Sequence, residues 1–71
     1  MSEVSPLRKK FAKNLLNIRK RSRLSQEELG FLAKLHRTYI GSVERAEQNI
    51  SIDNIHKLIK ALKIEASELF S

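Results

Sequence analysis

The sequence predicts an all-α domain of five short helices, on the basis of three observations. The chain has 71 residues, which is enough for one domain. It contains only two glycines and one proline, which argues against a turn-rich β structure. Apolar residues recur at helical spacing along most of the chain, as they do on the buried face of a helix. We therefore expect a single domain over residues 1–71.

The first two helices are located by their N-terminal signals. Ser5 suits an N-cap, and the proline that follows it is tolerated at the first helical position, so a helix is expected from Pro6 to near Arg21 or Ser22. Its apolar stripe would consist of Leu7, Phe11, Leu15 and Ile18. Ser25 and Glu28 match a capping box and predict a second helix over residues 26–33. The residues expected to face inward from it are Leu29, Leu32 and Ala33.

Three further helices complete the expected fold. One begins near His36 or Arg37 and ends near Arg45, with Ile40 and Val43 buried. Another follows a serine N-cap and covers about residues 52–62, with a wide apolar face. The last is short and covers about residues 66–70.

The charge of the chain is unevenly distributed. Fourteen basic and eight acidic residues give a net charge of +6, and no acid lies between Glu3 and Glu27, a stretch rich in lysine and arginine. A basic end of this kind suits a polyanionic partner such as nucleic acid. From charge alone, a membrane surface or a merely solvated helix face remains open.

Several functional classes are disfavoured by what the sequence lacks. Without cysteine there is no disulfide or thiolate metal site, and the distant His36 and His56 are expected to be solvent-facing or capping residues, so no metal or cofactor is expected. We find no nucleophile–base pair, glycine-rich phosphate loop or carboxylate cluster, so we expect neither an enzyme nor a small-molecule ligand. No apolar run is long enough to span a bilayer and no signal peptide is recognisable, so we expect a cytoplasmic protein without a membrane partner.

Two short helices joined by a tight turn form a helix-turn-helix pattern over about residues 25–45. In such a unit the second helix fits the major groove of DNA, and its first residues reach the base edges. The polar residues on the outer face of this helix are Arg37, Thr38, Gly41, Ser42 and Arg45.

The segments LSQEELGFLA (residues 24–33) and LHRTYIGSVER (residues 35–45) resemble the phage-repressor-like helix-turn-helix family, and the likeness extends over about residues 11–70. Within that family, LHRTYI followed by ER and an NIS segment is most similar to controller proteins of restriction–modification systems. The resemblance implies a compact five-helix domain that binds operator sites in double-stranded DNA as a homodimer and regulates transcription. The alternatives are a phage repressor, an antitoxin-type regulator and, in another class, a protein-interaction adaptor.

The resemblance also implies roles for individual residues. Arg37 and Thr38 match positions that read bases, and Ser42, one turn further on, is expected to face the groove as well. A phosphate contact is the alternative for Arg37, and a half-buried prop is the alternative for Tyr39. Contacts to the DNA backbone are expected from Ser25, Gln26, Tyr39, Arg45, Asn49, Lys10 and Lys13.

Glu44 would be an unfavourable neighbour for phosphates, and the resemblance implies that it instead forms a structural ion pair with Arg19. The chain departs from the family pattern twice. Gly41-Ser42 reverses a common Ser-Gly order, and Gln48 stands where controllers often carry arginine. The second departure puts the loop's contribution to DNA affinity in doubt.

The C-terminal part of the chain has more apolar residues than one small core can hide. Part of this set must close the domain, and we expect the rest to form a dimer interface over about residues 52–70. The residues expected there are Ile52, Ile55, Ile59, Leu62, Leu69 and Phe70.

Overall fold

A computed structural model describes residues 3–71, so residues 1 and 2 of the expected domain lie outside the described part. The elements are α1 (Pro6–Arg21), α2 (Gln26–Ala33), α3 (Arg37–Glu44), α4 (Ile52–Leu62) and the 3-10 helix η1 (Ala66–Leu69). No strand occurs within residues 3–71, in agreement with the expected all-α class. The fifth α-helix is a wrong prediction, because that segment is a single 3-10 turn. None of the helices in this range combines the length and apolar character needed to cross a membrane.

Serine side chains begin three of the four α-helices. The hydroxyls of Ser5, Ser25 and Ser51 each accept the amide of the third helical residue, at 3.1, 2.9 and 3.1 Å. Glu28 completes the box at α2 by accepting the Ser25 amide at 2.8 Å, and these bonds lower the pKa of Glu28. Because the pKa is lowered by folding, the stabilisation from this cap is present at neutral pH and is lost as the pH falls through the acid range.

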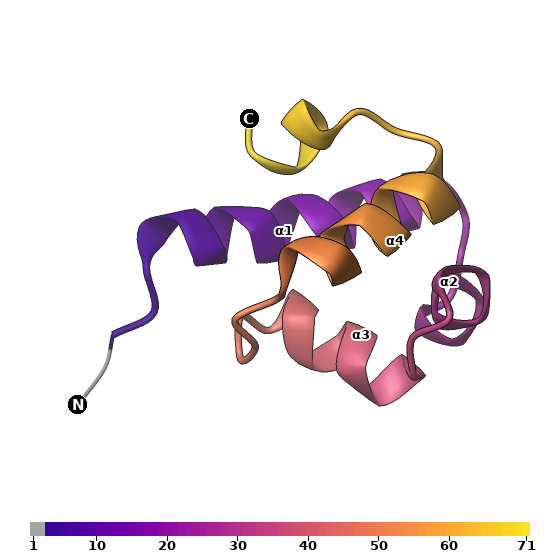
Figure 1. The fold of residues 1–71 in the computed structure, drawn as a ribbon, viewed down its shortest axis with the longest axis horizontal. Helices are drawn as coiled ribbons and strands as arrows, with labels where there is room; N and C mark the ends of the chain where they lie inside the picture. The colour runs from indigo at the N-terminus through magenta and orange to yellow at the C-terminus, as the bar shows by residue number, and fades with distance from the viewer. Residues whose placement is uncertain (1–2) are drawn as a thin grey trace.

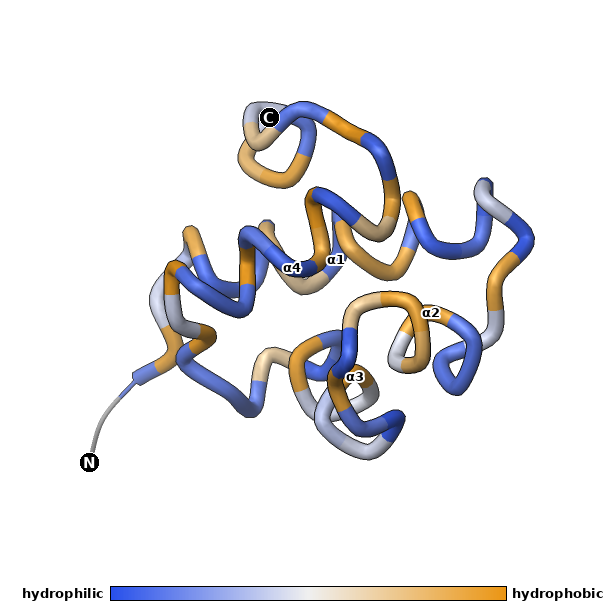
Figure 2. The backbone as a smooth tube through the Cα atoms, turned by 45° about the vertical axis from the view of Figure 1, so that its right-hand side comes forward, coloured by the Kyte–Doolittle hydropathy of each residue, from blue (hydrophilic) through white to orange (hydrophobic). Residues whose placement is uncertain are grey.

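The core is formed by buried residues from all four α-helices and η1, with α3 and η1 packed on α1 and α4 packed on α2. Its fully or nearly fully buried members are Phe11, Leu15, Ile18, Leu29, Ala33, Ile40, Val43, Leu58, Leu62 and Leu69. Apolar and hydrophilic residues alternate along α1 and α4 (Figure 2), as expected for helices with one buried face. In Figure 1, α3 lies below α1 and the C-terminal turn lies above it. α3 is the recognition helix, the one expected to enter the major groove of DNA. It therefore lies at one edge of the molecule.

Two apolar residues expected inside the core are exposed. Leu7 in the first turn of α1 is 56% exposed, and Leu32 in α2 is 51% exposed. In α2 the buried residues Leu29 and Ala33 are four positions apart, which places Leu32 at the margin of the buried face. Its neighbour Phe31 is 84% exposed.

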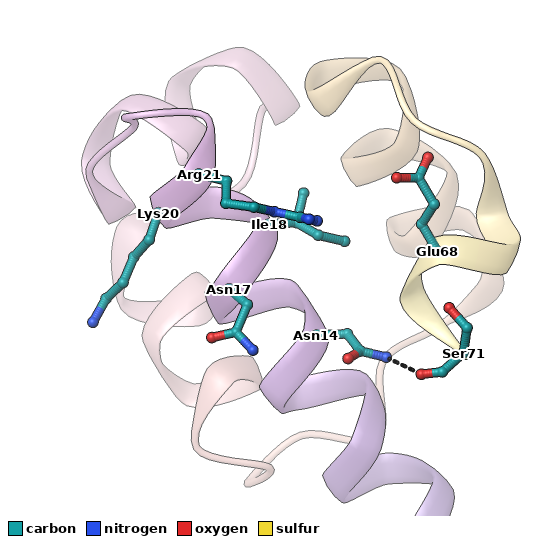
Figure 3. Close-up of a pocket in the computed structure, with 7 residues that line it drawn as sticks. All are labelled: Asn14, Asn17, Ile18, Lys20, Arg21, Glu68 and Ser71. Atoms are coloured by element: carbon teal, nitrogen blue, oxygen red, sulfur yellow. Dashed lines mark hydrogen bonds between the residues drawn. The ribbon is translucent and has the colours of Figure 1, made fainter.

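The C-terminal end is held against α1 by an asparagine. Asn14 donates its side-chain amide to the carbonyls of Leu69 at 3.0 Å and Ser71 at 3.3 Å, the second of which is drawn in Figure 3. Leu69 is completely buried, whereas Phe70 lies further out with its ring 5.3 Å from that of Phe11, centroid to centroid. A single turn thus both closes the core and presents an aromatic ring near the surface.

The turn between α2 and α3 requires glycine at position 30. The Leu35 amide donates to the Gly30 carbonyl at 2.8 Å, and a Cβ added at Gly30 would lie 2.4 Å from the Leu35 carbonyl oxygen. Because this neighbour is backbone, Gly30→Ala should lower the free energy of unfolding by about 1–3 kcal/mol. Urea denaturation would measure the change. Gly41→Ala is the control and should cost less, because its added Cβ meets only the ends of the Arg45 and Gln26 side chains.

Candidate nucleic-acid interface

The outer face of α3 presents two arginines to solvent. The side chains of Arg37 and Arg45 are 61% and 60% exposed, and Thr38 is also exposed. Arg37 is the first residue of the helix, at the end that lies beside α2 in Figure 1. When such a helix is inserted into the major groove, donor groups at this end are the ones that reach the base edges.

Each of these arginines is held by an exposed glutamate. Arg37 Nη1 lies 3.0 Å from Glu27 Oε2, and Arg45 donates through Nε and Nη2 to Glu47 at 2.9 and 3.1 Å. The second pair raises the pKa of Arg45 and lowers that of Glu47, chiefly through the hydrogen bonds between them. Exposed ion pairs of this kind are weak, so a polyanion can displace the carboxylates at little cost. Neither glutamate partner could be predicted, because contacts between such long side chains leave no pattern in the sequence.

His36 caps α3, one of the two roles expected for the histidines. Its Nδ1 accepts the Thr38 amide at 3.1 Å and lies 2.8 Å from the Thr38 hydroxyl oxygen. The side chain of Thr38 is therefore held close to the N-terminus of the helix.

Ser42 is not available to read bases, and this expectation is corrected. The residue is only 8% exposed, and its hydroxyl donates to the Tyr39 carbonyl at 2.7 Å. Ser42 lies between the buried residues Gly41 and Val43, so this part of α3 faces the protein interior. The residues at the start of the helix carry the exposed polar face instead.

Tyr39 occupies the half-buried position that was the alternative to a phosphate contact. Its ring packs against the core, and its hydroxyl oxygen accepts the side-chain amide of Asn54 in α4 at 3.1 Å. The hydroxyl proton is not used in this bond and remains free to donate.

A buried ion pair fixes α3 to α1 and α2. Arg19 donates to both carboxylate oxygens of Glu44, through Nε at 2.6 Å and Nη2 at 3.0 Å, and through Nη1 to the Leu24 carbonyl at 2.8 Å. The side chains of Arg19 and Glu44 are 10% and 3% exposed. Glu44 also accepts the Gln26 side-chain amide at 3.0 Å, so Gln26 braces the recognition helix. The acid that looked unfavourable for a polyanion is thus buried and neutralised.

The other expected backbone contacts differ in how well their positions suit that role. Ser25 and Asn49 are exposed, at the start of α2 and in the loop after α3. Lys10 is nine residues from Arg19, which at about 100° per residue puts it on the opposite side of α1 from α3. Lys13 lies about 120° from Arg19 by the same arithmetic. The contacts expected from Lys10 and Lys13 stay predictions, and both residues lie on α1 well away from the face that meets α3.

The residues expected at a dimer interface are divided by their burial. Leu62 and Leu69 are core residues, 9% and 0% exposed, and the expectation is wrong for both. Ile55 and Ile59 are partly buried against the core. Ile52 and Phe70 remain exposed, at 80% and 37%. Together with Leu7 they line an open apolar groove between the N-terminal ends of α1 and α4 and the C-terminal turn.

Comparisons with known proteins agree on the class of this fold. A helix-turn-helix family matches residues 15–69. The control protein C.SmaI of Serratia marcescens is 43% identical over 60 residues, which are 84% of this chain and 71% of that protein. The control protein C.BamHI of Bacillus amyloliquefaciens is 49% identical over 49 residues, 69% of this chain, but the match spans only 60% of that relative.

Solved structures give the same result. The restriction-modification controller protein C.AhdI of Aeromonas hydrophila superposes with a TM-score of 0.86 at 49% identity, covering 89% of this chain and 96% of that one. The controller C.Esp1396I, solved as a tetramer with its natural 35 base-pair operator, superposes with a TM-score of 0.85 at 30% identity, covering 93% and 87%. The chain therefore belongs to the helix-turn-helix family and, within it, to the group of restriction–modification control proteins.

Proposed function

We propose that this protein is a transcription regulator that binds an operator in double-stranded DNA as a homodimer and has no catalytic activity. The observation that carries the proposal is the exposed start of α3, where Arg37 and Thr38 project from a helix that Arg19 and Gln26 brace through Glu44. A neighbour of the same fold has been solved with its operator, which supports DNA as the target. We further propose that residues 1–71 act as one unit in the cytoplasm, where bacterial DNA lies.

The division of labour within the interface follows from side-chain chemistry. Arg37 carries a planar fork of donors, which suits the two acceptors of guanine in the major groove. Arg45, Asn49, Ser25 and the start of α2 suit the phosphates, and Tyr39 adds its free hydroxyl proton. Arg37 and Thr38 would thus select the sequence, while the other groups position the protein.

A selection from random duplex DNA followed by binding measurements tests this function. The wild-type protein should enrich a sequence with two-fold symmetry and bind it at least 1,000-fold more tightly than scrambled DNA, on the order expected of specific regulators. Affinity should fall steeply with salt, because phosphate contacts release counterions. Equal affinity for selected and scrambled DNA would refute the proposal.

Two-fold symmetry requires a self-complementary surface, and we place it at the groove lined by Leu7, Ile52 and Phe70. Ile52→Glu should convert the dimer to the 8.2 kDa monomer in sedimentation equilibrium, because it puts a charge on an apolar interface. The fold should survive, since Ile52 is 80% exposed within one chain. Phe31→Glu is the matched control, an equally exposed apolar residue on α2, and should leave the dimer intact. The opposite pattern would move the interface to α2.

A further inference from the structure

The N-terminus of α3 contains a hydrogen-bond arrangement that restricts what Thr38 can recognise. His36 Nδ1 is 3.1 Å from the Thr38 amide nitrogen and 2.8 Å from the Thr38 hydroxyl oxygen. Both contacts are made by one nitrogen of one imidazole, so its protonation state decides the direction of both bonds.

The direction of the bonds follows from the backbone. An amide N–H can only donate, so the Nδ1 that receives it must be unprotonated and must present its lone pair. The Thr38 hydroxyl oxygen lies 2.8 Å from the same nitrogen, so the hydroxyl must also donate its proton to Nδ1. The single hydroxyl proton of Thr38 is therefore directed at His36, and the two lone pairs of the oxygen point elsewhere.

A threonine hydroxyl without this constraint serves as donor or acceptor and contacts several bases or a phosphate. With its proton committed to His36, Thr38 can only accept. Phosphate oxygens, guanine O6 and N7, and thymine O4 are themselves acceptors and do not match it, whereas the exocyclic amino groups of adenine and cytosine are donors and do.

We propose that His36 is a positioning residue that makes Thr38 read an exocyclic amino group, of adenine or cytosine, in the major groove. This inference rests on the proposed function and sharpens it. Arg37, which only donates, and Thr38, which only accepts, then read opposite hydrogen-bonding groups from adjacent positions. His36 itself need not touch the DNA.

The test begins by finding the base that Thr38 faces. Dissociation constants are measured for the wild-type protein and for Thr38→Val, which replaces the hydroxyl by a methyl group, on the selected operator and on each single-base variant of it. The facing position is the one where the preference of the wild type is lost in Thr38→Val. We expect adenine or cytosine there, preferred about 2- to 12-fold over bases without the amino group, the range of one neutral hydrogen bond. Replacing an adenine by purine, or a cytosine by 2-pyrimidinone, removes only the amino group and should give the same loss.

Variants of His36 then separate positioning from folding. His36→Ala removes the acceptor and should abolish the preference for the amino group. His36→Asn supplies a side-chain oxygen that caps a helix well and can accept both bonds, so it should retain the preference. The ratio of two dissociation constants within one variant cancels any change in the folded fraction.

The outcomes distinguish this inference from the function on which it rests. If the wild type does not discriminate selected from scrambled DNA, the proposed function fails. If the wild type does discriminate, guanine or thymine at the facing position would overturn the inference. So would a Thr38→Val variant that keeps the wild-type preference at every position. Equal ratios of dissociation constants for His36→Ala and His36→Asn would overturn it as well.

Discussion

Replacing Glu44 by alanine is expected to lower the free energy of unfolding by about 3–5 kcal/mol. Glu44 accepts two hydrogen bonds from Arg19 and one from Gln26, and its side chain is 3% exposed. Without it, the Arg19 guanidinium stays in the interior, and within residues 3–71 the Leu24 carbonyl is its one remaining hydrogen-bond partner. A domain of this length has a total stability of roughly 4–10 kcal/mol, so the loss would leave much of the protein unfolded near 37 °C.

Urea denaturation followed by circular dichroism measures this loss. Glu47→Ala is the matched control, because it breaks an exposed pair with Arg45 and should leave the midpoint nearly unchanged. The double variant Arg19→Met, Glu44→Leu should recover a large part of the stability, since a buried pair is often replaced by apolar residues without loss. Recovery will be incomplete, because the Leu24 carbonyl and the Gln26 amide lose their partners. A change of less than about 1 kcal/mol in Glu44→Ala would show that the pair is not buried in solution.

The boundaries of the helices could be predicted because they depend on neighbouring residues. The hydroxyls of Ser5, Ser25 and Ser51 act within three residues of themselves, so the sequence alone locates the starts of α1, α2 and α4. The Arg19–Glu44 pair was predicted by a different route, from the motif it shares with a family, since 25 residues separate the two.

The rotation of each helix about its axis was harder to predict. Ser42 looked like part of an exposed polar face, but α3 has only eight residues and is packed by α1 and α2, which turn Ser42 inward. Lys10 is basic and exposed, so it looked suited to a DNA contact. The Arg19–Glu44 pair, however, fixes which face of α1 meets α3, and Lys10 lies on the opposite face. Charge and polarity identify residues that suit an interface, whereas tertiary packing decides which of them reach it.

The final turn shows the same difficulty on a smaller scale. Leu69 and Phe70 are adjacent and both strongly apolar, so composition does not tell core from surface. The bonds from Asn14 to the carbonyls of Leu69 and Ser71 fix this turn with Leu69 inside and Phe70 outside. That arrangement depends on a contact across 55 residues, which no local pattern reveals.

Replacing Arg37 by alanine is expected to have the largest effect on DNA recognition. A bidentate contact from arginine to guanine contributes about 1–3 kcal/mol of discrimination, so the ratio of affinities for selected and variant operators should fall roughly 5- to 150-fold. The fold should be unaffected, because the side chain is 61% exposed and forms its ion pair with the exposed Glu27. Fluorescence anisotropy with the selected operator and with a variant at each guanine would measure the ratio.

Arg37→Lys decides between reading a base and contacting a phosphate. Lysine keeps the charge and satisfies a phosphate, but it lacks the planar fork that matches guanine O6 and N7. Base reading by Arg37 therefore predicts that Arg37→Lys keeps the salt dependence of the wild type and loses most of its discrimination. If Arg37 instead contacts a phosphate, Arg37→Ala should leave the ratio of affinities unchanged. The slope of log affinity against log salt concentration should then fall by about 1. Arg21→Ala is the control, because it removes an exposed arginine at the C-terminal end of α1, and it should preserve the ratio of affinities. A fall in that ratio seen only for Arg37→Ala would then reflect the place of Arg37 at the start of α3 rather than the loss of one positive charge.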